Sequence, residues 1–173
     1  MATLTLSQLI LPTFTKGLKT LDHILTRAEQ HAASKGLDPD AEYPDTRLID
    51  DMNPLTFQVQ TTTKAVRVTL SRCLGQDLEA WRDEEKTIAD LHKRVGLALM
   101  LLEGVDAKTI DDQAGEVIEL PFAGLTLRLA ARDAALNHGL PNFFFHISTA
   151  YAILRSKGVP IGKADYLGGF LAH

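Results

Sequence analysis

Four long segments of this sequence repeat apolar residues every three or four positions, and each repeat runs up to a glycine. Residues at that spacing lie on one face of an α-helix, and such a face must be buried against another element. The repeats predict helices at about residues 4–35, 54–74, 83–103 and 141–157, packed by their apolar seams into one helical bundle. The seam residues are Phe14, Leu18, Leu21, Leu25, Ala28 and Ala32; Leu55, Val59, Thr62, Val66, Leu70 and Cys73; Ile88, Leu91, Val95, Ala98 and Leu102; and Leu140, Phe144, Ile147, Tyr151 and Leu154.

Prolines mark two of the predicted helix starts. Proline fixes φ and has no N–H, so it suits the first turn of a helix better than the interior. Asn53 followed by Pro54 predicts an N-cap and a first helical residue, and Pro141 opens the last helix. Pro12 lies inside the first repeat, where it predicts a bend or a short separate first turn.

Between the third and fourth repeats the helical spacing gives way to strict alternation. Residues 116–120 and 125–129 alternate in character around a short turn, which predicts a β-hairpin at about 116–129. We expect Ile118 and Leu120 to share one face and Leu125, Leu127 and Leu129 to share another. Because a lone hairpin is marginally stable in water, it should pack on the helices or on a partner subunit.

Length and composition fit one cytoplasmic domain. The 173 residues are enough for a single core, so we expect one domain over residues 1–173. Eighteen basic and 22 acidic residues give a formal net charge of −4 without a basic stripe, which argues against nucleic-acid binding. No apolar run approaches the ~20 residues of a membrane span, and no leader peptide is recognisable. The one cysteine, Cys73, lies in the second seam, where a buried and unreactive thiol is expected.

The last predicted helix carries polar side chains beside its apolar seam. Asn142 and His146 are four residues apart and share a face next to the three phenylalanines at 143–145. Polar groups beside a buried seam need hydrogen-bond partners, water or a ligand. Two interpretations stay open: a histidine satisfied within the core or an interface, or one wall of a binding pocket.

Four short sequence motifs together resemble those of a family of unknown function within the DinB/YfiT-like four-helix-bundle superfamily. They are Asp51-Met52-x-Pro54-Leu55-x-x-Gln58-Val59, Leu140-Pro141-Asn142-Phe143-Phe144-Phe145-His146, Thr149-Ala150-Tyr151-Ala152-Ile153-Leu154-Arg155 and Gly158-Val159-Pro160-Ile161-Gly162-Lys163. The resemblance covers nearly the whole chain. It implies a mainly α-helical, four-helix up-down bundle with the hairpin between the third and fourth helices, a tendency to form homodimers, and a cavity between helices.

The wider superfamily is similar to metal-dependent thiol transferases and hydrolases that use three histidines. One of these comes from the second helix, and two come from a His-x-x-x-His pair on the fourth. In this sequence Asn142 and His146 stand at the pair, and Gln58 or Gln60 stands where the second helix would supply its histidine. Since neutral amides are poor ligands for transition metals, we expect no tightly bound metal and no other cofactor, with the pocket kept in the same place.

The first hypothesis for function is a small-molecule-binding bundle that acts without a cofactor. Because imidazole titrates near pH ~6.5, His146 could serve as the general acid or base of an isomerase, cyclase or lyase. Asn142 would orient a carbonyl or hydroxyl group, and Tyr151 would donate a proton or a hydrogen bond. Asp51 would tune the imidazole if the loop before the second helix approaches it. The expected ligand-binding residues are Gln58, Pro141, Phe143 and Phe144.

Two alternatives belong to other classes of protein. One is a non-catalytic dimeric module in which the polar groups of the last helix are structural. The other is a metal-dependent hydrolase or transferase with a degenerate site made of His146, Asp51 and a glutamine.

Overall fold

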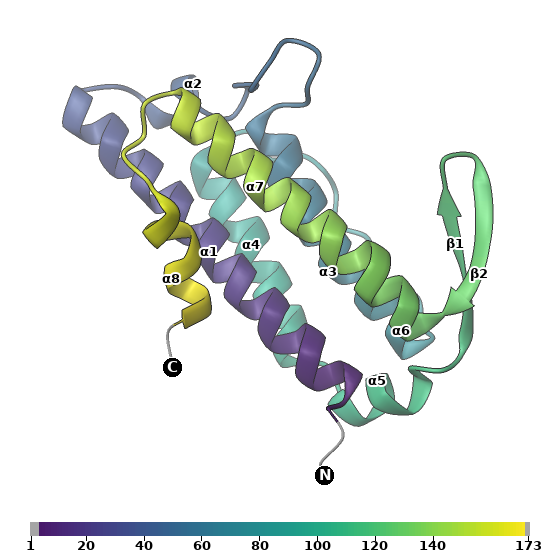
Figure 1. Ribbon diagram of the computed structural model, residues 1–173. Helices are drawn as coiled ribbons and strands as arrows, with labels where there is room; N and C mark the ends of the chain where they lie inside the picture. Colours follow the sequence, from purple (N-terminus) through teal and green to yellow (C-terminus); the bar gives the residue numbers. More distant parts are fainter. Residues whose placement is uncertain (1–3, 172–173) are drawn as a thin grey trace.

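Four long helices enclose the core of the computed structural model, which describes residues 4–171 (Figure 1). They are α1 (Leu6–Lys35), α3 (Leu55–Leu74), α4 (Ile88–Glu103) and α7 (Leu140–Ser156). α1 packs against α4 and α7, and α3 packs against the same two helices. The seams predicted for the first three of these helices are buried throughout. α1 continues without a break through Pro12, which is exposed near the start of the helix.

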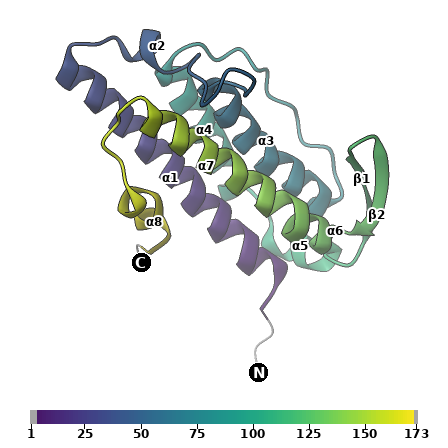
Figure 2. The same cartoon turned by 45° about the horizontal axis from the view of Figure 1, so that its top comes forward.

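The two middle helices run in the same direction. Both begin at one end of the bundle: the Ile88 N–H that opens α4 donates to Asp40 Oδ1 at 2.8 Å, and the Leu55 N–H that opens α3 donates to the Thr46 carbonyl at 2.9 Å. The expected alternation of up and down helices is therefore wrong between α3 and α4. Residues 75–87 return along the length of the bundle (Figure 2). About twelve extended residues reach ~40 Å, more than the ~30 Å length of a 20-residue helix.

A buried arginine of α4 holds this return segment against the bundle. Arg94 Nη1 donates to the Arg82 carbonyl and to Glu85 Oε1, both at 2.8 Å, while Nη2 donates to Asp83 Oδ1 at 2.9 Å. The guanidinium also lies over the ring of Trp81, 5.2 Å from its centroid. Because these contacts keep the segment extended, the helix predicted to start near residue 83 begins only at Ile88.

The N-terminal caps of α3 and α4 differ from those predicted. Thr87 and Asp90 form a reciprocal capping box in front of α4, so the helix starts where that box lies. At α3 the N-cap position belongs to Pro54, with no side-chain hydrogen bond, and Asn53 does not cap the helix with its amide.

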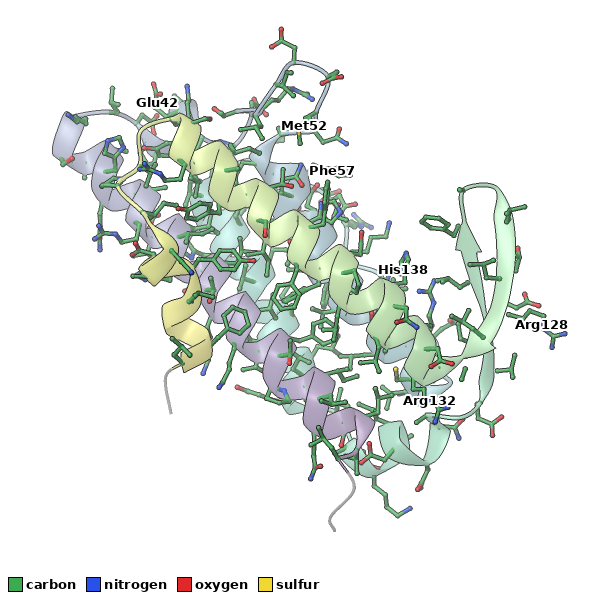
Figure 3. All side chains as sticks on the ribbon, viewed as in Figure 1. Glu42, Met52, Phe57, Arg128, Arg132 and His138 are labelled. Carbon is green, nitrogen blue, oxygen red and sulfur yellow. The ribbon has the colours of Figure 1, made fainter. Side chains whose placement is uncertain are left out.

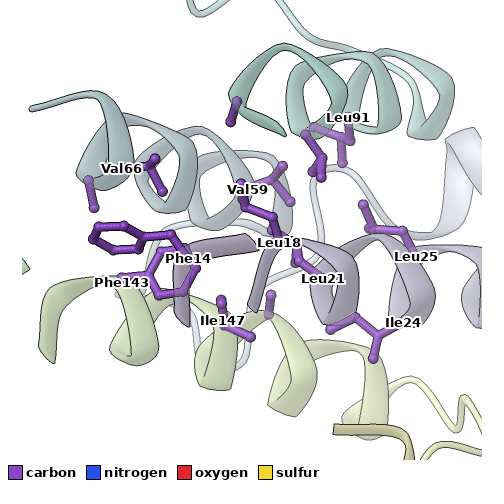
Figure 4. Close-up of a cluster of buried hydrophobic side chains, with 14 of the residues drawn as sticks. Phe14, Leu18, Leu21, Ile24, Leu25, Val59, Val66, Leu91, Phe143 and Ile147 are labelled. Carbon is purple, nitrogen blue, oxygen red and sulfur yellow. The ribbon is translucent and has the colours of Figure 1, made fainter. Parts of the chain in front are cut away.

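The core lies where the seams of the four long helices meet (Figure 4). Phe14 and Phe143 pack edge to face with ring centroids 4.9 Å apart, which joins α1 to α7. A Cβ atom on Gly17 would lie 2.4 Å from the Phe143 ring, so only glycine permits this approach of the two helices. The inward face of α7 is rotated from the predicted seam. Its fully buried residues are Phe143, Ile147, Ala150, Ile153 and Leu154.

The predicted seam residues Phe144 and Tyr151 are covered instead by α8 (Lys163–Leu171). Phe144 lies 5.8 Å from Phe170, and Tyr151 lies 5.8 Å from Tyr166, measured between ring centroids. The apolar side chains of α7 are thus shared between two surfaces, the core and the underside of α8.

The predicted hairpin is present as β1 (Val117–Phe122) and β2 (Leu125–Ala130), joined by a turn at Ala123 and Gly124 with positive φ angles of 50° and 81°. Ile118 pairs with Leu129, and Leu120 pairs with Leu127. Directly opposed residues share a face of an antiparallel pair, so the two apolar sets lie on one face rather than on two. Leu120 in the middle of β1 is 3% exposed, whereas Leu125 at the tip is 66% exposed. The hairpin projects from the bundle beside α7 (Figure 1).

Short elements connect the larger ones. They are α2 (Pro39–Glu42), α5 (Ala107–Gln113), α6 (Ala131–Ala134) and the π-helical turn η1 (Ala135–Gly139), which runs directly into α7. None of the helices within residues 4–171 is long and apolar enough to cross a membrane.

Candidate functional site

A histidine and a glutamine meet between α7 and α3. His146 Nδ1 lies 2.8 Å from Gln58 Oε1, and Gln58 Nε2 donates to the Asn53 carbonyl at 2.9 Å. A carbonyl oxygen can only accept, so the amide NH₂ of Gln58 faces Asn53 and its oxygen faces the imidazole. The proton of neutral His146 is therefore on Nδ1, and Nε2 keeps the free lone pair.

The imidazole of His146 is buried between aromatic rings. Phe57 on α3 and Phe145 on α7 pack edge to face with it, at 6.0 and 5.1 Å between ring centroids. Burial lowers the pKa of His146, because the charged imidazolium loses hydration. The neutral form, with one fixed tautomer, therefore prevails at neutral pH.

The donors around His146 do not fit a three-histidine metal centre. Gln58 and His146 hydrogen-bond each other, so their oxygen and nitrogen atoms do not point together at a position where a metal ion could bind. Within residues 4–171, no three His, Cys, Asp or Glu side chains are grouped so that they could hold a metal ion. One imidazole nitrogen and one amide make a weak donor set for zinc or nickel.

A cavity of about 260 Å³ opens between α3 and the start of α7, next to the His146 pair. Phe57 lines this cavity and also contacts His146, so one aromatic ring separates the two features. Figure 3 shows Phe57 and His138 on the side of the bundle from which the hairpin projects. We call this cavity the α3–α7 groove. Its lining residues are Phe57, Gln60, Thr61, Lys64, Ala65, Val68, Thr69, Arg72, Asp83, His138, Gly139 and Asn142.

The wall opposite α3 depends on the π-helical turn. A Cβ atom on Gly139 would lie 2.4 Å from Thr69 Oγ1, so glycine is required for the turn to rest on α3. The turn brings His138 into the groove, where the Phe122 ring packs edge to face at 6.1 Å between centroids. His138 Nδ1 is buried and has no hydrogen-bond partner within the described chain. Burial, and then the nearby charge of Arg72, lower the pKa of His138.

The groove carries two cations that are not neutralised. Lys64 and Arg72 both line it, and neither makes an ion pair within residues 4–171. The acidic residue on the rim, Asp83, is already paired with Arg94 at 2.9 Å. Arg72 is half-buried, and this burial lowers the pKa of its guanidinium because the charged form loses hydration.

Only some of the residues expected from the sequence meet here. Gln58 and His146 are in contact, and Asn142, one helical turn before His146, lines the groove. Asp51 is exposed in the loop before α3, and no hydrogen bond joins it to His146 within the described chain. Tyr151 lies on the α8 side of α7, where its hydroxyl donates to the Ile161 carbonyl at 3.4 Å.

The three other expected ligand contacts lie outside the groove. Phe143 is fully buried in the core, Phe144 lies under α8, and Pro141 is exposed. Among the groove residues that the sequence did not predict are its cations Lys64 and Arg72 and the imidazole of His138. One local signal was available: Lys64, Val68 and Arg72 follow each other at four-residue spacing, which puts them on one face of α3.

Comparisons with known proteins agree with the fold. A family model described as "Domain of unknown function (DUF1993)" matches residues 6–167. The structure is similar to the crystal structure of a DinB family member protein from Shewanella denitrificans, with a TM-score of 0.87 and 36% sequence identity over 97% of this chain and 94% of that chain. No curated protein matches the chain. The family resemblance that was predicted from the four sequence motifs is thereby confirmed.

Proposed function

The chain belongs to the family defined by the domain of unknown function DUF1993, and we propose that within this fold it binds a small molecule in the α3–α7 groove. The observation that carries the proposal is a preformed cavity of about 260 Å³, in which the imidazole of His138 and the cations of α3 are combined with the apolar side chains of Phe57, Ala65 and Val68. Cavities with apolar walls and a few polar groups are the usual binding sites of small molecules.

The structure around the groove supports a binding role in a second way. Gly139 and Thr69 are in a close approach that only a glycine allows, so the position of the opposite wall is fixed by packing. A wall fixed in this way loses little conformational entropy when a ligand arrives.

A fragment screen by amide NMR tests this proposal. Fragments of metabolite size should shift the signals of Thr61, Val68 and Gly139, and Thr61→Trp should abolish these shifts by filling the groove. Thr126→Trp, on an exposed strand position of the hairpin, serves as the matched control and should leave them intact. Shifts confined to the opposite side of the bundle, or unchanged binding by Thr61→Trp, would refute the proposal.

Cofactor-free proton transfer by His146 is a second candidate function, and its single tautomer favours it. Gln58 holds Nδ1–H, so the neutral ring offers Nε2 as a base. Diethyl pyrocarbonate acylates unprotonated imidazole, so His146 should react more slowly than the exposed His23, and faster once Phe57→Ala opens the path from the groove. A His146 that stays unreactive in both proteins cannot exchange a proton with a ligand in the groove.

A homodimeric structural role is the alternative, supported by the exposed apolar face of the hairpin. Phe122 is 57% and Leu125 is 66% exposed on that face, and a second copy of the chain could cover both. Sedimentation velocity should show a dimer that Leu125→Glu converts to a monomer, while Thr126→Glu on the other face leaves it unchanged. A wild-type protein that remains monomeric at high concentration excludes this role.

A further inference from the structure

We infer that the ligand of the α3–α7 groove is a small amphipathic anion, whose acidic group binds between Arg72, Lys64 and His138 and whose apolar body lies along α3 towards Phe57. This inference rests on the proposed function of the groove and adds the chemical class of its ligand. It follows from the charges, the hydrogen-bonding positions and the shape of the cavity.

The sign of the charge in the groove is opposite to that of the whole protein. The chain has a formal net charge of −4, yet Lys64 and Arg72 face the cavity without acidic partners in the described part of the chain. Asp83 does not neutralise them, because its carboxylate is held by Arg94. A partly dehydrated guanidinium without a counter-charge is a favourable place for an anion.

The polar groups converge from two walls. Lys64 and Arg72 are eight residues apart on α3, about 12 Å along the helix axis, with Val68 between them. Their long side chains can meet on one acidic group over Val68. His138 approaches from the π-helical turn; its Nδ1 is buried, so Nε2, which makes no hydrogen bond within residues 4–171, is the nitrogen that can donate to the same group.

The rest of the groove suits an apolar body. Towards the start of α3 the lining continues with Ala65 and Phe57, and the Phe122 ring packs edge to face against His138. The volume of about 260 Å³ lies below the roughly 300–1,000 Å³ of sites for drug-sized molecules, so the ligand is of metabolite size. Both a carboxylate and a phosphate monoester match this description, since arginine binds either group with two parallel hydrogen bonds.

Titration calorimetry with three probes tests the inference: 4-phenylbutyrate, phenyl phosphate and the neutral 4-phenylbutyramide. The anions should bind at least about tenfold more tightly than the amide, the effect of one charge-assisted hydrogen bond. Arg72→Met should remove that preference, Arg72→Lys should restore part of it, and Lys64→Met should reduce it. Arg132→Met and Lys35→Met, which remove exposed cations outside the groove, should leave it unchanged. The tighter of the two anions identifies the acidic group.

The outcomes separate this inference from the proposed function. If the amide binds as tightly as the anions, or if Arg72→Met and Lys64→Met both keep the preference, the ligand class is wrong although the groove still binds molecules. If no probe binds, or if Thr61→Trp fails to block the probes that do, both the ligand class and the groove are refuted. Thermal melts of each variant show that a lost preference does not come from unfolding.

Discussion

Replacing Arg94 with methionine should remove the anchor of residues 75–87 while keeping a side chain of similar length. The guanidinium is 2% exposed and donates to the carboxylates of Glu85 and Asp83 and to Thr63 Oγ1. Removal of one partner from a buried ion pair costs about 3–5 kcal/mol. Glu85 is only 12% exposed and loses a charged partner, whereas Asp83 is 52% exposed and can be hydrated. We therefore expect a loss near the lower limit, about 3 kcal/mol.

The assay is urea denaturation followed by circular dichroism, with thermal melting alongside. For a chain of this size a loss of about 3 kcal/mol lowers the melting temperature by about 6–12 °C. Lys93→Met, the neighbouring position on α4, removes an exposed cation and should leave the unfolding curve unchanged. Adding Glu85→Gln to Arg94→Met should recover part of the loss, because the buried carboxylate is then neutral.

Hydrogen exchange shows where the damage lies. The hydrogen-bonded amides of residues 76–87 should exchange faster in Arg94→Met, while those of α1 should change only with global stability; the four are those of Gln76, Leu78, Lys86 and Thr87. A loss below about 1 kcal/mol, or uniform exchange across the chain, would show that the ion pairs do not hold the return segment and that the reasoning is wrong.

Three further predictions follow from the packing and the charges. Gly139→Ala should destabilise the protein by about 1–3 kcal/mol through its clash with Thr69, whereas Gly96→Ala, which has open space, should be neutral or stabilising in the same urea assay. The pKa of His92 is raised, first by its hydrogen bond to a carboxylate of α1, so its contribution to stability should be full below pH ~6.5 and lost as the pH rises through the folded-state pKa. His92→Gln should accordingly cost more at pH 5.5 than at pH 8.5, and an equal cost at both would contradict this. Burial raises the pKa of Cys73 to about 11, so iodoacetamide at pH 8 should modify it only when urea unfolds the chain.

The helices could be predicted because their information is local. The spacing of residues such as Leu18, Val59 and Leu91 fixes an apolar face whatever the rest of the chain does. The error on α7 has a physical cause: Phe144 and Tyr151 are apolar because α8 covers them, so the helix has two buried faces and the spacing cannot tell them apart. The direction of α4 depended on a long return segment, whose path no local pattern records.

The candidate site was predictable only in part, for a similar reason. Resemblance to a family placed Gln58 and His146 together, and they do touch. Lys64 and Arg72 carry no local sign of a site, because it is the π-helical turn that brings His138 into the same groove. That approach depends on Gly139 lying against Thr69, a contact between residues 70 positions apart.

The two faces of α3 have different roles. Val59, Val66 and Leu70 face the interior, while Lys64 and Arg72 lie on the other side of the same helix. Substitutions at Lys64 or Arg72 can therefore change the surface of the α3–α7 groove without touching the buried face of α3. The side chains that line the groove can therefore change while the packing of the bundle stays the same.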